Sequence, residues 1–147
     1  MASFRINSSN NFYLLVGAAG RAHPDSNDYW DGNWLDSNIE INAGAFRGAY
    51  GACLRGDEFQ AFRDKLVPLY TALSGEAEFS SMENWLAIKI KGDGLGHFEA
   101  ECKARDTFGS DSRLEFTLSF DQTQLPEIIK GIDSILEKFP VRGRSDV

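Results

Sequence analysis

Histidines, cysteines and carboxylates are the side chains of this sequence that could hold a metal ion or perform catalysis. His23, His97, Cys53 and Cys102 are far apart and follow no metal-ligand spacing. The residues of a Ser-His-Asp triad have no fixed spacing in the sequence, so spacing cannot reveal one. The Gly-x-Ser-x-Gly motif that often carries the serine is absent from the sequence. We therefore expect no metal, no cofactor and no catalytic residue. Both cysteines should face the apolar side of their strands as small hydrophobic side chains.

Gly92, Gly94 and Gly96 are spaced like glycines of a phosphate-binding loop. Such a loop lies between a strand and a helix whose N-terminus faces the anion. Here a strand-like pattern follows the glycines, so the spacing predicts a hairpin turn.

Glu99, Glu101 and Glu115 fall on one face of two predicted neighbouring strands, where two carboxylates could act as acid and base. Lys103 and Arg113 alternate with them. This mixture is typical of ion pairs across the solvated face of a sheet. The three glutamates remain candidates for contact with a partner.

Residues 25–40 combine carboxylates with large aromatic rings and contain no Lys or Arg. The rings can bury area against a partner, and the carboxylates can pair with its cations. The alternative is a strand edge whose rings enter the core while the aspartates form turns. Within this segment the candidate binding residues are Asp28, Tyr29, Trp30, Asp31, Trp34 and Asp36.

Trp85 has the strand parity of Lys89 and Lys91, which places it on the polar face of its predicted strand. An exposed Trp on such a face indicates contact with a partner or a second copy of the chain. A neighbouring loop could instead cover the ring, and both interpretations stay open.

The elements that must position these residues follow from hydrophobic periodicity. Apolar residues with period two predict strands over 4–6, 12–16, 39–43, 46–54, 86–90, 98–104 and 114–120. In the fourth of these, Phe46 should share the apolar side with Tyr50, Ala52 and Leu54. Glycines at 48 and 51 indicate a bulge or close packing there.

Two amphipathic helices are predicted, over 57–74 and 123–139. Asp57 is the expected N-cap of the first helix, with Gln60 completing a capping box, and Gly75 its expected stop. Thr123 is the expected cap of the second.

Together these elements predict an α+β fold, a mostly antiparallel β-sheet with two amphipathic helices packed on one face. We expect one domain over residues 1–140 and a polar tail over 141–147. The 147 residues, 42% of them apolar and 25% charged, are enough for a packed core.

Net charge and hydropathy limit the partners. The formal charge of −7 disfavours nucleic acid and favours a partner with a basic surface. No apolar run reaches the roughly 20 residues that span a bilayer. Residues 12–19 suit a core strand better than an export signal. These features predict a soluble, cytoplasmic protein that contacts no membrane.

Several short sequence segments, spread in order along nearly the whole chain, resemble those of the WapI-type immunity proteins, which neutralise bacterial polymorphic toxins. They are Asp28-Tyr29-Trp30-Asp31, Ala43-Gly44-Ala45-Phe46-Arg47-Gly48, Leu73-Ser74-Gly75-Glu76-Ala77, Glu83-Asn84-Trp85-Leu86, the turn at 92–94 and Asp121-Gln122-Thr123-Gln124-Leu125-Pro126. The resemblance implies an α+β antidote that occludes a cognate toxin without catalysis.

Two other functions stay open beside the immunity function. One is a small-molecule or nucleotide-processing enzyme with a carboxylate site near residues 25–36. The other is an oligomeric adaptor or structural protein that self-associates through the face carrying Trp85.

Overall fold

The computed structural model describes residues 2–107 and 111–146, which form eight strands and three helices. In chain order these are β1 (Ala2–Asn7), β2 (Tyr13–Arg21), α1 (Tyr29–Gly32), β3 (Trp34–Ala43), β4 (Phe46–Arg55), α2 (Gly56–Ala72), β5 (Ser74–Ser80), β6 (Leu86–Asp93), β7 (His97–Ala104), β8 (Leu114–Asp121) and α3 (Gln124–Lys138). The predicted α+β class is confirmed.

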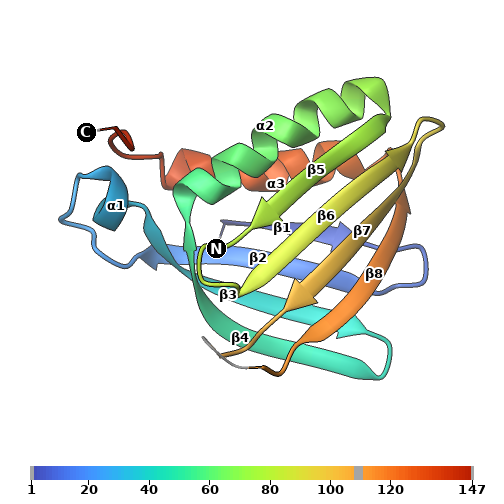
Figure 1. Cartoon of the computed structure of the whole chain (residues 1–147), viewed down its shortest axis with the longest axis horizontal. Coiled ribbons are helices and arrows are strands. Elements are labelled where there is room, and N and C mark those ends of the chain that lie inside the picture. The colour runs from blue at the N-terminus through green and yellow to red at the C-terminus, as the bar shows by residue number, and fades with distance from the viewer. Residues whose placement is uncertain (1, 108–110, 147) are drawn as a thin grey trace.

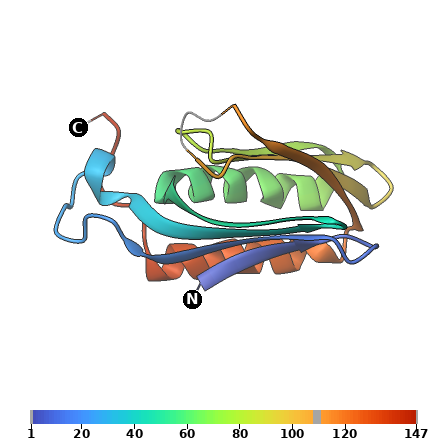
Figure 2. The same ribbon diagram turned by 90° about the horizontal axis from the view of Figure 1, so that it is seen from below.

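The strands form two separate antiparallel sheets, in the order β1-β2-β3-β4 and β5-β6-β7-β8. Each sheet is followed directly by one long helix, so the chain repeats a four-stranded meander plus helix. Figure 1 shows the strands of the two sheets crossing, with α2 and α3 on the same side of the molecule. Figure 2 separates the two sheets, which lie one above the other.

The apolar residues of the period-two patterns enter one core between these elements. In β7 the alternation is complete, with Phe98, Ala100, Cys102 and Ala104 buried and the residues between them exposed. One buried cluster contains residues of both sheets and both long helices. The apolar faces of the two sheets therefore pack against each other and against the two long helices.

The long helices lie beside the edge strands and pack on each other. From β1, the ring of Phe4 lies 6.2 Å from that of Phe59 and 6.0 Å from that of Phe62, both on α2. From β5, the ring of Phe79 lies 5.4 Å from that of Phe59. The α3 helix approaches β1 at Gly131, where an added Cβ would lie 2.6 Å from the Ser3 carbonyl oxygen.

The ends of α2 differ from the sequence expectation. The N-cap is Arg55 and not Asp57, and Glu58 in place of Gln60 accepts a 2.8 Å hydrogen bond from the Arg55 amide. It ends at Leu73, which takes the left-handed conformation (φ 63°) expected of Gly75. The short α1 and all of β5 were not predicted.

Strand β4 also corrects the sequence expectation. Phe46, expected on the apolar side, lies at the tip of the β3–β4 hairpin and is 68% exposed. Cys53, expected to face the core, is only half-buried and pairs with the exposed Asp36. The register between β3 and β4 is continuous, so Gly48 and Gly51 form no bulge.

Residues after α3 return to the start of the chain's third strand. Arg142 accepts a 2.9 Å hydrogen bond from Asn33 through its carbonyl and donates one of 2.9 Å to Asn33 through its amide. Val147, the last residue of the expected tail, lies outside the described residues. None of the described helices has the length and hydropathy needed to cross a membrane.

Candidate functional site

Four of the aromatic and acidic residues of segment 25–40 lie together at α1: Asp28, Tyr29, Trp30 and Asp31. Asp28 caps this single turn, because its carboxylate accepts a 3.0 Å hydrogen bond from the Asp31 amide. The rings of Tyr29 and Trp30 meet edge to face at 5.0 Å. Trp30 is 50% exposed, and Asp28 and Asp31 are both exposed beside it. A large ring and two carboxylates thus face solvent together.

A buried cation from outside the segment organises these rings. Arg55, at the end of β4, is fully buried and forms a 2.9 Å ion pair with Asp57. It donates hydrogen bonds of 2.8 Å to the Tyr29 carbonyl and 2.7 Å to the Trp30 carbonyl. Its guanidinium lies 5.1, 5.5 and 4.9 Å from the ring centres of Tyr29, Trp30 and Trp34. Bonds of this kind are what a charged group needs to be stable inside a protein.

Asn33 connects α1 to the segment that follows α3. Its buried amide donates to the carbonyls of Tyr29 and Arg142, each at 2.9 Å. The Arg142 guanidinium in turn donates to the Pro24 and Ser26 carbonyls at 2.9 and 2.7 Å. The loop that leads into α1 is therefore fixed from two directions, and Trp30 is displayed on a rigid base.

Glu58 connects this region to the β5–β6 turn. One carboxylate oxygen accepts from the Arg55 amide and the other, at 2.6 Å, from the Met82 amide. Burial raises the pKa of Glu58 to about 7. Met82 itself is 55% exposed, so a second apolar side chain reaches solvent next to the start of α2.

Asp36 and Trp85 line a different surface, a groove of about 400 Å³ that also contains Cys53. Trp85 is half-buried and packs against the core just before β6 begins. Its indole Nε1 is buried without a hydrogen-bond partner in the described part of the chain. The Tyr50 hydroxyl donates a 2.8 Å hydrogen bond to the Trp85 carbonyl, which joins β4 to the second sheet.

The remaining predicted residues, Glu99, Glu101 and Glu115, lie on the exposed face of the second sheet. Glu101 pairs with Lys91 at 3.7 Å, and Glu115 pairs with Lys103 at 3.8 Å. These exposed pairs across neighbouring strands belong to a mixed-charge surface. The structure does not bring this face together with α1.

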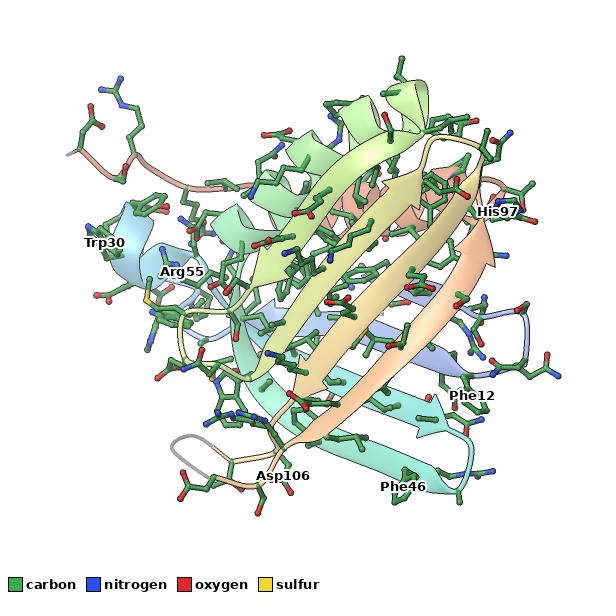
Figure 3. All side chains as sticks on the ribbon, turned by 45° about the vertical axis from the view of Figure 1, so that its right-hand side comes forward. Phe12, Trp30, Phe46, Arg55, His97 and Asp106 are labelled. Carbon is green, nitrogen blue, oxygen red and sulfur yellow. The ribbon has the colours of Figure 1, made fainter. Side chains whose placement is uncertain are left out.

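His97 lies apart from these surfaces, whereas His23 is in the loop that leads into α1. His97 is exposed and its Nδ1 lies 3.0 Å from the Asp93 carboxylate, in the hairpin between β6 and β7. Figure 3 places His97 at the opposite end of the molecule from Trp30 and Arg55. Over residues 2–107 and 111–146 no group of three His, Cys, Asp or Glu side chains could hold a metal ion.

Sequence reasoning missed Arg55, Glu58 and Met82. The one signal for Arg55 was its position, a cation directly after the apolar run 52–54 and two residues before Asp57. The partners of Arg55 on α1 are 25 and 26 residues away, so local spacing could not reveal them.

Comparison with known proteins gives a family and a fold. A family model described as the immunity protein WapI-like family matches residues 5–140. No curated protein matches the chain. Among solved structures, the MRP1/MRP2 proteins of Trypanosoma brucei are similar, with a TM-score of 0.51 at 10% identity over 94% of this chain and 86% of that chain. At this identity the likeness concerns the fold alone.

Proposed function

This chain belongs to the WapI-like immunity protein family, and we propose that it binds a cognate bacterial toxin domain and neutralises it by occlusion, without catalysis. The proposal places the chain in the cytoplasm of the cell that it protects. A protein of this kind needs a rigid surface that fits its target, and no reacting group.

The observation that supports this function most directly is the display of Trp30. The ring is half exposed, yet its backbone is held by Arg55 and its neighbour Tyr29 is fixed by a 2.8 Å hydrogen bond from the Tyr29 hydroxyl to Asp57. Little conformational entropy remains to be lost when such a side chain binds. Exposed, preorganised tryptophans often contribute most of the energy of an interface.

Carboxylates define the charge of the proposed partner. Asp28 and Asp31 lie beside Trp30, and the chain as a whole carries −7. A toxin surface rich in Lys and Arg would be drawn to this region and oriented by it. We assign the primary interface to α1 and treat the separate groove at Asp36 and Trp85 as a second contact.

Co-expression of the chain with the toxin domain encoded beside its gene tests this function. Wild-type protein should restore growth and co-purify with the toxin domain. Trp30→Ala should weaken the measured affinity about 30-fold, which corresponds to the roughly 2 kcal/mol typical of a central aromatic residue. Adding Asp31→Ala should weaken it further.

Leu95→Ala provides the matched control, because Leu95 is 81% exposed at the β6–β7 turn, at the far end from α1. It should leave affinity and survival unchanged. Equal survival with the Trp30→Ala, Asp31→Ala double variant would remove α1 from the interface. Absence of any binding by the wild-type chain would contradict the immunity function itself.

A further inference from the structure

Strand β4 is a long edge strand, with no strand beyond it among residues 2–107 and 111–146. Its ten residues pair with β3 on one side, and β4 is the last strand in the order of its sheet. Figure 1 shows β4 along the border of the molecule that lies farthest from α2 and α3. An edge strand presents a row of N–H and C=O groups that can pair with another chain.

Two glycines in this edge are required neither by the backbone conformation nor by close packing within the described part of the chain. Gly48 and Gly51 do not have positive φ angles, and the register with β3 is unbroken around them. A Cβ added at either position would meet its nearest atom at 3.9 Å, which is an ordinary contact. Glycine in a strand otherwise marks a site where another backbone or a ligand comes close. Neither cause is present among residues 2–107 and 111–146, so the two glycines leave open space for a partner beside β4.

The chain is hollowed next to each glycine, on opposite faces of β4. Gly51 lies in the groove of about 400 Å³ with Asp36 and Trp85. Gly48 lies in a second hollow of about 250 Å³. Ile41 of β3 and residues on both sides of the β7–β8 connection, among them Ala104 and Leu114, line this hollow. Successive side chains of a strand point to opposite faces. A strand laid along β4 would therefore send alternate side chains into the two hollows.

We propose that β4 accepts an extended strand of a protein partner along Phe46–Gly51, which continues the first sheet and inserts alternate side chains on its two faces. This is recognition by strand addition, in which main-chain hydrogen bonds supply affinity and side-chain pockets supply specificity. The exposed Phe46 ring, beside the start of the edge, offers the incoming strand an apolar contact.

The chemistry of the hollows describes the partner. In the outer groove Asp36 is exposed beside the Trp85 ring, which suits an Arg or Lys whose aliphatic part lies on the indole. The inner hollow combines apolar walls with Arg47, Arg113 and Asp106, which suits a mid-sized side chain with a polar end. Arg47 and Arg113 balance Asp36 and Asp106 at this edge, so the choice of partner rests on the net charge of −7, which favours a basic protein over a second copy of this chain.

The identity of the partner rests on the proposed function, since the probe is the toxin domain encoded beside the gene. Gly48→Val and Gly51→Val put a branched side chain into the hollow next to each glycine, where a side chain of the added strand would enter, and the new Cβ has room in the free protein. Because Val favours strands, both variants should melt no lower than wild type. Both should bind the toxin domain at least tenfold more weakly.

Gly20→Val is the matched control. Gly20 lies in β2, two strands from the edge, and an added Cβ there meets no atom within 4 Å. It should leave affinity unchanged. Amide hydrogen exchange of the wild-type complex should show new protection in residues 46–51.

The outcomes separate the two proposals. If wild type binds and the two glycine variants bind as tightly, strand addition is wrong and the immunity function stands. If wild type does not bind, the function fails and the strand partner named here fails with it. Sedimentation of the free chain as a dimer that Gly51→Val dissociates would replace the toxin strand with a second copy and overturn the proposal.

Discussion

Arg55 and Trp30, 25 residues apart in the sequence, are joined by a 2.7 Å hydrogen bond from the Arg55 guanidinium to the Trp30 carbonyl. The bond connects a fully buried cation to a residue whose side chain is half exposed. The same guanidinium lies 5.5 Å from the indole ring centre. A substitution at the buried Arg55 should therefore change the conformation of α1 at the surface.

Arg55→Met should lower the free energy of unfolding by about 3 kcal/mol, since it leaves the partly buried Asp57 without its cation and two carbonyls without their donor. Urea unfolding followed by circular dichroism measures the loss. Tryptophan fluorescence should also shift to longer wavelength as the rings around Arg55 loosen.

Arg63→Met is the matched comparison, because the Arg63–Asp133 ion pair is more than a third exposed on both sides. Its loss should cost less than about 1 kcal/mol. Equal destabilisation by the two substitutions would show that the burial of Arg55 has no special energetic role.

Stability should fall as pH rises through neutrality because of Glu58. Burial raises its pKa from 4.5 to about 7, so between these values the folded state binds more protons than the unfolded state. The contribution is fully present below about pH 4.5 and is lost as pH rises through about 7. Its size is up to about 3 kcal/mol, from roughly 1.4 kcal/mol for each pKa unit.

Glu58→Gln isolates this effect from the other carboxylates. The variant cannot ionise at this position, so its unfolding free energy should depend less on pH between about 5 and 8 than that of wild type. Parallel pH profiles of the two proteins would contradict the assignment to Glu58.

Asn33→Ala should release the segment after α3. It removes the amide that donates to Tyr29 and Arg142 and the oxygen that accepts from the Arg142 amide. Amide hydrogen exchange should rise at residues 140–144 and in α1, with a loss of about 2 kcal/mol in stability. Unchanged exchange at residues 140–144 would mean that other contacts hold the segment.

Gly131→Ala should destabilise the fold by about 2 kcal/mol, because the new Cβ would lie 2.6 Å from the Ser3 carbonyl oxygen and 2.7 Å from the Phe4 Cα. The α3 helix would have to move away from β1. Gly20→Ala adds the same methyl group in open space and should be neutral. Thermal unfolding of both variants measures the difference.

Elements with strong periodicity could be predicted from the sequence. In β7 and in the long helices, apolar residues recur at the spacing of one buried face, and the structure buries them. Strand β5 could not be predicted in the same way, since its seven residues contain only Ala77 and Phe79 as buried apolar positions. Its strand form depends on pairing with β6.

The division into two sheets was also hidden, because period two gives the buried face of a strand but not its neighbours. The long connection through α2 places β4 and β5 in different sheets. The same limit explains Phe46, whose parity is apolar but whose place at a hairpin tip lies beyond the core.

The unusual composition of segment 25–40 could be seen in the sequence, but the arrangement of its side chains could not be predicted. Its composition revealed rings beside carboxylates, and the structure divides them between a half-exposed Trp30, a partly buried Trp34 and an exposed Asp36 in a separate groove. The organising cation comes from β4, and only tertiary contact brings it to α1.

The packing of α3 on β1 joins the last long element of the chain to its first. The first strand therefore lacks its covering helix until residues 124–138 have left the ribosome, and neither four-stranded half contains a complete core of its own. Folding should be a late, all-or-none event during synthesis. A binding surface that depends on this core would then be complete only after residues 124–138 have been synthesised.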